Sequence, residues 1–170
     1  FVNELLKKGR TRVAFLADTS RKEIEPDTRL IAMRYFLGKA GAPFDERRLC
    51  CFQENIVTLS ASEFGYNATA NILRNFPDTD AIFCVNDKVA LGAYKCLTER
   101  GIRIPQDVSL CGCDDMLISR YMSPAISSMG YDKAEFGRLC MNNIMEQLKG
   151  NKEQERKIIL YAEYRARDSV

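Results

Sequence analysis

The feature that most constrains the fold is the stretch 80–124, in which two short apolar runs flank an amphipathic segment. Each run ends abruptly at a polar pair, Asn86-Asp87 after the first and Asp114-Asp115 after the second. This alternation is typical of a strand, a helix and a second strand, the repeating unit of a parallel sheet. Because ligands bind beyond the carboxyl ends of strands in open parallel sheets, the same stretch also indicates a binding site.

The rest of the chain continues the alternation. Apolar runs predict strands, and apolar residues spaced three and four apart predict helices. We therefore expect an α/β fold with an open, mainly parallel sheet flanked by helices on both faces. The charged stretch 151–157 is the best linker candidate. The expected strands are 13–17, 48–52, 81–85, 108–112, 126–129 and 158–162, and the expected helices are 2–8, 26–40, 87–100, 133–149 and one capped by Ser60 or Ser62.

Size and composition exclude several classes of protein. A length of 170 residues with 46% hydrophobic residues suits one domain with a substantial core. The net charge is only +2 and the basic residues are scattered, so the sequence predicts no basic surface for binding nucleic acid. No stretch is long enough to span a membrane, and no secretion signal is present. The first residue is not methionine, so we expect a fragment or a processed protein and a cytoplasmic setting.

The chain has seven cysteines and no histidine. An odd count with several cysteines inside apolar runs predicts reduced thiols. The closely spaced Cys50-Cys51 and Cys111-Gly112-Cys113 do not match a zinc site, and we expect no metal. Without histidine, the usual Cys-His and Ser-His-Asp nucleophile systems are excluded. Neither glycine-rich phosphate-binding pattern occurs, so no cofactor is predicted.

Polar side chains end three of the predicted strands. Asp18 follows the first strand, Asn86 the middle one and Asp114 the last of the core. Right-handed connections place all three at one edge of the sheet, where they suit a hydroxyl-rich or amine-bearing ligand. An equally ordinary interpretation makes Asn86 a helix N-cap and the two acids Asp114 and Asp115 a cap or turn.

Arg29, in the first turn of a predicted helix, is a fourth candidate, because a guanidinium can bind a ligand oxygen bidentately. The alternative is a surface ion pair with Asp27 or Glu25. The adjacent acids Asp114 and Asp115 could suggest acid–base catalysis, but neighbours on an extended segment point to opposite sides.

Several motifs resemble one known family. F-C-V-N-D-K-V-A-L-G-A, R-I-P-Q-D-V-S-L-C-G-C-D-D and R-Y-M-S-P-A-I-S-S occur in this order, preceded by L-L-K-K-G-R-T-R-V-A-F-L and T-R-L-I-A-M and followed by E-Y-R-A-R-D-S. Together they resemble the lac-repressor/galactose-repressor family of bacterial transcription regulators across nearly the whole chain. The resemblance implies a periplasmic-binding-protein-like fold of two lobes, of which this chain is mostly one.

By this resemblance, residues 1–128 and 153–170 form the C-terminal lobe of an effector-binding domain. Residues 129–152 form a crossover segment and a helix that belong to a largely absent first lobe. The ligand contacts fall on Arg29, Asn86 and Asp114. The helix-turn-helix headpiece that binds operator DNA is absent, and the intact regulator would be a homodimer.

Three departures from the family pattern bear on the ligand. Ala32 replaces a glycine, Cys113 replaces an aromatic residue, and Leu59-Ser60 stands where many members stack an aromatic ring on a sugar or base. The effector, a sugar or a nucleobase-like molecule, is therefore left open.

The function expected is effector sensing in a transcription repressor. A transporter's solute receptor with the same fold is the alternative, and an enzyme is the third class. With most of the first lobe missing, the helix 133–149 is expected to dock against, or swap with, another copy of the chain.

Overall fold

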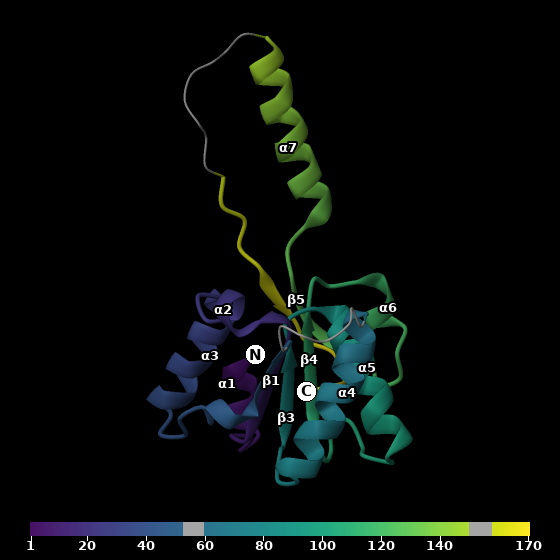
Figure 1. The fold of residues 1–170 in the computed structure, drawn as a ribbon. Coiled ribbons are helices and arrows are strands. Elements are labelled where there is room, and N and C mark those ends of the chain that lie inside the picture. Colours follow the sequence, from purple (N-terminus) through teal and green to yellow (C-terminus); the bar gives the residue numbers. More distant parts are fainter. Residues whose placement is uncertain (53–59, 150–157) are drawn as a thin grey trace.

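A computed structural model describes residues 1–52, 60–149 and 158–170 of the chain. These residues form one sheet of six strands in the order β2-β1-β3-β4-β5-β6 (Figure 1). Neighbouring strands are parallel, except that β6 runs antiparallel to β5. The predicted α/β class and mainly parallel sheet are confirmed. The strands are β1 (Val13–Ser20), β2 (Leu49–Phe52), β3 (Ala81–Cys84), β4 (Ser109–Cys113), β5 (Ser127–Gly130) and β6 (Glu163–Arg165).

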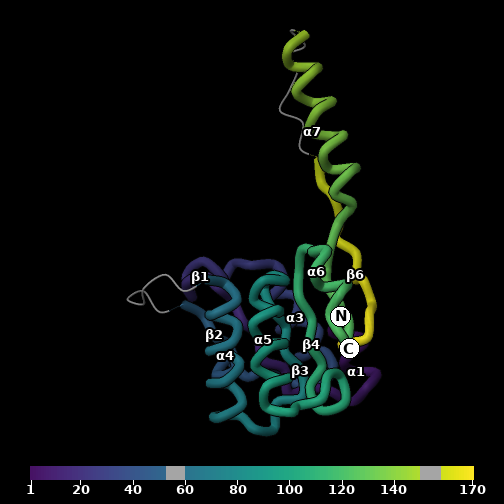
Figure 2. Tube along the Cα trace, turned by 90° about the vertical axis from the view of Figure 1, so that its right-hand side faces the viewer, coloured from purple at the N-terminus to yellow at the C-terminus, as the bar shows by residue number. Residues whose placement is uncertain are grey.

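The central strands are buried on both faces. Every residue of β3 and β4 is buried, as are the first five residues of β1. A parallel sheet of this kind needs helices on each side. Figures 1 and 2 show α1 (Val2–Lys7), α2 (Arg21–Ile24) and α3 (Thr28–Lys39) on one side, and α4 (Ala61–Asn75) and α5 (Asp87–Glu99) on the other.

Two glycines set the close contact between α4 and α5. A Cβ atom added to Gly92 would lie 1.9 Å from the Ser62 carbonyl oxygen, and one added to Gly65 would lie 2.1 Å from that of Val89. Neither distance is possible for real atoms, so only glycine permits this backbone approach. The helix α4 begins at Ser60, whose side chain forms a reciprocal capping box with Glu63.

The helix α7 (Lys133–Leu148) stands away from this body (Figure 1). None of its residues is buried. The chain leaves the body through β5 and re-enters it through β6, and residues 158 and 160 lie beside α7 on the way back. The short helix α6 (Leu117–Arg120) lies between β4 and β5 in the chain.

Three details of the predicted elements are wrong. Residues 158–162 do not form a strand, because they accompany α7 outside the sheet, and β6 begins only at Glu163. The strand β1 continues to Ser20 instead of ending at residue 17. The helix α2 was not predicted, because its four residues are too few to show a helical period.

Some sequence expectations lie outside the described residues, namely the linker at 151–157 and the role of Leu59. All seven cysteines lie inside the described parts and are free thiols. Within those parts, no helix is both long and apolar enough to cross a bilayer.

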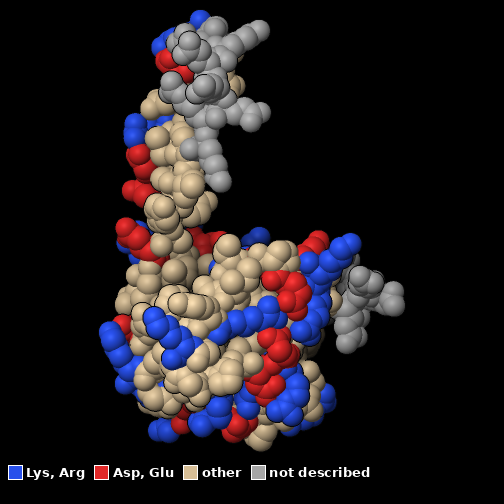
Figure 3. All heavy atoms as spheres, turned by 90° about the vertical axis from the view of Figure 1, so that its left-hand side faces the viewer, with Lys and Arg blue, Asp and Glu red and all other residues tan. Residues whose placement is uncertain are grey.

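Acidic and basic side chains intermingle on the face that carries α2 and α3 (Figure 3). Arg34 illustrates the pattern, with ion pairs to Glu25 at 2.8 Å and Glu46 at 2.7 Å. Paired charges of this kind do not form the one-signed field that attracts nucleic acid.

Candidate functional site

The side chains of Asp18 and Asn86 meet at the carboxyl edge of the sheet. The Asn86 amide nitrogen donates hydrogen bonds to both carboxylate oxygens of Asp18, at 3.0 and 3.1 Å. The Asn86 amide oxygen accepts from the backbone N–H of Val89 at 2.8 Å and caps α5. Asn86 therefore is a helix cap, and it also joins the ends of β1 and β3.

Arg29 lies in the first turn of α3 and makes the predicted pair with Asp27. Its Nε and Nη2 donate to the two Asp27 oxygens at 2.8 and 2.5 Å, and its Nη1 donates to the Val85 carbonyl oxygen at 2.5 Å. The hydrogen bonds from Arg29 lower the pKa of Asp27, against the opposing effect of burial. Glu25, the other partner considered, pairs with Arg34 instead.

The Arg29 guanidinium also lies near the Cys113 thiol at the end of β4. Burial raises the pKa of that thiol and Arg29 opposes the rise, so Cys113 carries no ready nucleophile. Arg29 thus bonds to the residue before Asn86 and lies near the residue before Asp114. A guanidinium has five N–H donors, so some donor capacity remains for a ligand oxygen.

Asp114 directly follows β4 and is exposed. Its backbone N–H donates to the Met129 carbonyl oxygen at 2.7 Å. Among the described residues, none forms a hydrogen bond or ion pair with its carboxylate. Since β1, β3 and β4 are neighbours in the sheet, Asp18 near the end of β1 lies at the same edge as Asn86 and Asp114, which follow β3 and β4.

The two adjacent acids do not lie on an extended segment, contrary to the sequence-based expectation. Asp114 and Asp115 both have positive φ, 99° and 45°. This left-handed region costs roughly 1–2 kcal/mol for a non-glycine residue, although aspartate tolerates it better than most. Asp115 forms ion pairs with Arg120 and Arg167. With one carboxylate paired and the other exposed, the two do not form a proton-transfer dyad.

Asp87, the first residue of α5, was not among the predicted site residues. It is fully buried directly behind Asn86 in the chain. Its carboxylate accepts from the Met116 backbone N–H at 2.6 Å, Ser128 Oγ at 2.7 Å and Ser119 Oγ at 2.8 Å. Burial raises the pKa of Asp87 and these hydrogen bonds oppose the rise. A Cβ on Gly112 would lie 2.2 Å from Asp87 Oδ1. The position of Gly112 in the middle of a buried strand was the sequence signal that another side chain, here that of Asp87, occupies the space beside it.

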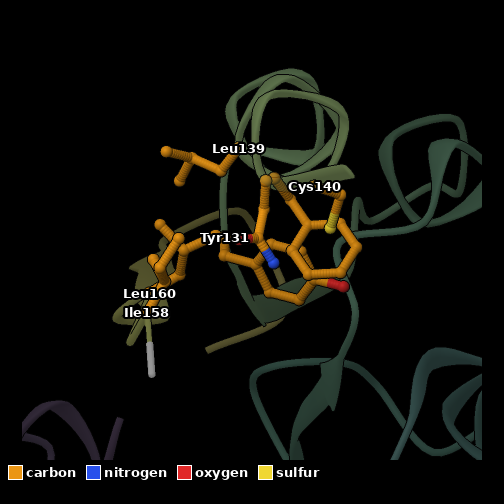
Figure 4. Close-up of a pocket in the computed structure, with 7 residues that line it drawn as sticks. Tyr131, Leu139, Cys140, Ile158 and Leu160 are labelled. Atoms are coloured by element: carbon orange, nitrogen blue, oxygen red, sulfur yellow. The ribbon is translucent and has the colours of Figure 1, made fainter. Parts of the chain in front are cut away.

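Two apolar hollows lie near these elements. One, of about 400 Å³, has Arg29 on its rim and is otherwise lined by side chains such as Phe1, Met33 and Phe83. The other, of about 410 Å³, lies between α7 and the returning chain (Figure 4). Tyr131 and Cys140 point into it, and its lining contains none of the predicted ligand residues.

A family model described as a periplasmic binding protein-like domain matches residues 2–170. The ribose operon repressor of Haemophilus influenzae is 34% identical over 108 residues, which are 64% of this chain and 32% of that protein. The transcriptional repressor PurR of Haemophilus influenzae is 37% identical over 86 residues, 51% of this chain and 26% of that protein. The matched part of the chain spans about a quarter to a third of the length of these curated relatives.

Solved structures show the same relationship over nearly the whole chain. A LacI family transcriptional regulator from Arthrobacter sp. FB24, in complex with lactose, superimposes with a TM-score of 0.81 at 29% identity, covering 99% of this chain and 61% of that one. The Escherichia coli transcriptional repressor ascG gives a TM-score of 0.80 at 27% identity, covering 99% and 59%. The chain therefore belongs to the periplasmic-binding-protein-like domain family, and it is similar to regulators of the lac-repressor/galactose-repressor family.

Proposed function

We propose that this chain is the effector-binding part of a transcription repressor and that Arg29, Asn86, Asp114 and Asp18 contact the effector. The observation that supports the proposal is the hydrogen bonding of Asn86 to Asp18 at the carboxyl edge of the sheet, with Arg29 bonded to the Val85 carbonyl beside them and Asp114 following the neighbouring strand β4. Two relatives named as repressors, and a LacI family transcriptional regulator solved with lactose, support the regulatory role.

The charges at this edge favour a neutral ligand with many hydroxyl groups. Asp18 and Asp114 bring two carboxylates, whereas the charge of Arg29 is largely balanced by Asp27. Carboxylates accept hydrogen bonds from hydroxyl groups, and the remaining guanidinium donors suit hydroxyl or carbonyl oxygens. A sugar fits this set better than a phosphorylated molecule, which two carboxylates would repel. A neutral nucleobase or nucleoside is the second ligand class.

The division into lobes is part of the proposal. Residues 1–128 and 153–170 would form one lobe, and residues 129–152 would cross into the other. The support is the position of α7, which leaves the body by β5 and has no buried residue. The hollow between α7 and the returning chain would be covered by the other lobe, whose remaining residues would come from chain outside the 170 residues.

A second copy of the chain would pack against α5 and α6. Leu117 and Tyr121 of this surface are 65% and 77% exposed. Beside them is a hollow of about 660 Å³ lined in part by Tyr66, Tyr94 and Met122. Aromatic residues and methionine are enriched at protein interfaces. In the intact regulator, closure of the two lobes on the effector would change the spacing of the DNA-binding headpieces of this homodimer.

The competing functions make different demands. A transporter's solute receptor would bind the ligand without any DNA-binding partner, whereas a repressor acts in the cytoplasm on operator DNA. An enzyme would need a nucleophile or base at the site. The relatives are repressors, and Asp114 and Asp115 do not form an acid–base pair.

The test is calorimetric titration of the intact protein with D-ribose, lactose and inorganic phosphate. We expect a neutral sugar to bind and phosphate not to bind. Asp114→Ala should weaken binding by about 1–3 kcal/mol, about fivefold to 150-fold. The matched control is Asp107→Ala, because Asp107 is an exposed aspartate paired with Arg103 at the other end of β4. Equal affinities for Asp114→Ala and the unmodified protein would remove Asp114 from the site.

A further inference from the structure

The second acid after β4 is held by four different parts of the fold. The Asp115 carboxylate accepts from Arg120 of α6 at 2.8 Å and from Arg167, just after β6. Its backbone N–H donates to Ser128 Oγ of β5 at 3.0 Å, and its carbonyl oxygen accepts from Lys133 Nζ at the start of α7 at 3.1 Å. Asp115 is thus bonded to the segment that leaves the body and to the segment that returns.

The outgoing strand passes Asp115 at van der Waals distance. A Cβ added to Gly130 would lie 2.4 Å from the Asp115 Cβ, so β5 can lie here only because residue 130 is glycine. The preceding residue, Asp114, donates its backbone N–H to Met129 in the same strand. The left-handed backbone at both aspartates shapes the loop to meet β5 in this way.

We infer that Asp115 is a positioning residue that joins the loop carrying Asp114 to both crossover strands, β5 and β6, so that loop and crossovers move as one unit. The inference rests on the proposed function in one respect, the contact of Asp114 with the effector. Movement of the crossovers would then shift the Asp114 carboxylate, and an effector that holds Asp114 would bias the crossovers by the same free energy.

A purely local role, such as closing the turn before α6, does not explain the contacts. That turn would need only Arg120, five residues away in the chain. Arg167 lies 52 residues away, and it also donates to the Ile126 carbonyl oxygen at 2.6 Å and to Ser127 Oγ through its backbone N–H at 2.9 Å. Charge-assisted hydrogen bonds are about twice as strong as neutral ones, so this pair fixes the return segment against the loop.

The first test is hydrogen exchange by mass spectrometry on the intact, effector-free protein with Asp115→Asn. This change keeps the shape and removes the charge. We expect amides in 126–134 and 163–168 to exchange about tenfold to a hundredfold faster, as expected when a charged hydrogen bond is lost. Peptides covering 13–17 should not change. Asp107→Asn, which removes the charge of another paired aspartate, should leave the crossovers unchanged.

The second test runs in the opposite direction. Arg167→Lys should accelerate exchange in 112–116, the loop itself, because lysine cannot reproduce the arginine fork. Its control is Arg165→Lys, since Arg165 pairs with Glu163 at 2.8 Å instead of with the loop. Unchanged exchange at the partner segment in either variant would overturn the inference. Equal acceleration throughout the body would overturn it too, because it would show a merely structural role.

Neither test needs a ligand, so the two proposals can fail separately. If both exchange results appear but no sugar binds, the proposed function is wrong and the connection through Asp115 stands. If sugar binds and weakens with Asp114→Ala, while Asp115→Asn leaves the crossovers unchanged, the inference about Asp115 is wrong.

Discussion

The body of the chain and α7 contain similar apolar side chains in opposite surroundings. Phe15 in β1 is fully buried and packs edge-on against Phe83 at 5.2 Å between ring centroids. Phe136 in α7 is 48% exposed and has only Tyr131 as an aromatic neighbour among the described residues, at 5.5 Å. An apolar stripe predicts a helix equally well in both cases, but it does not say whether the surface that covers the stripe belongs to the same lobe.

The largest expected difference between the two regions is in core truncation. Phe15→Ala should lower the free energy of unfolding by about 3–5 kcal/mol, because it leaves a cavity among packed strands. Phe136→Ala should change it by less than about 0.5 kcal/mol in the 170-residue chain. Urea unfolding of both variants measures the contrast. Similar losses for the two would mean that α7 folds against the body in solution.

Glycine substitution gives a smaller contrast. Gly92→Ala should cost about 1–3 kcal/mol, because the new methyl group forces α4 away from α5. Gly137 in α7 has nothing within 4 Å of an added Cβ, so Gly137→Ala should stabilise that helix by up to about 1 kcal/mol. Thermal unfolding should show shifts of opposite sign. A neutral Gly92→Ala would contradict the tight seam between the two helices.

The junction between the regions should respond to acid. Burial favours the protonated form of Asp115, but the hydrogen bonds from Arg167 and Arg120 outweigh it and lower its pKa below the ordinary 3.8. A lowered folded-state pKa contributes stability that is complete above the ordinary value and is lost as the pH falls through the folded value. Exchange at the crossovers, corrected for the intrinsic rate, should therefore rise as the pH falls below the ordinary value and through the lower folded-state pKa of Asp115.

Asp115→Asn provides the check on this acid response. The variant should already exchange fast at neutral pH and should gain little more on acidification. A profile that matches that of the unmodified protein would assign the response to another carboxylate.

Substitutions in α7 should have the smallest effect on the free energy of unfolding, but they should change the association of the chain with other copies. The 170-residue chain studied alone should associate through the exposed side chains of α7, because the described residues leave none of its side chains buried. Ile144→Glu should lower the mass measured by light scattering, with little change in unfolding free energy. Lys149→Glu is the control, since it changes charge on the polar end of the helix. A mass that Ile144→Glu leaves unchanged would exclude α7 as the contact.

Much of the fold was predictable from local signals. Short apolar runs with polar ends located β1, β3 and β4, because buried parallel strands require such runs. The spacing of apolar residues located α3, α5 and α7. The last strand could not be found in this way. Residues 158–162 form an apolar run, which predicts a strand, but they lie outside the sheet, whereas β6 contains charged, partly exposed residues.

The candidate site was predictable where the residue type and its place near the end of a strand were enough, as for Asp18 and Asn86, whose contact the structure shows. Asp87 and Asp115 could not be recognised. Their roles depend on partners far away in the chain, Ser128 for Asp87 and Arg167 for Asp115. An aspartate that is buried looks the same in a sequence as one on the surface.

Asn86 both bonds to Asp18 and caps α5, and this double role limits how the ligand preference of such a lobe can change. Asp18, near the end of β1, and Asp114, in the loop after β4, do not start a helix with their side chains, so selection or design can alter them one at a time. Asn86 also starts α5 through Val89, and losing an N-cap costs about 1 kcal/mol. A library randomised at these positions should therefore recover many residues at 18 and 114, but mainly asparagine, aspartate, serine and threonine at 86.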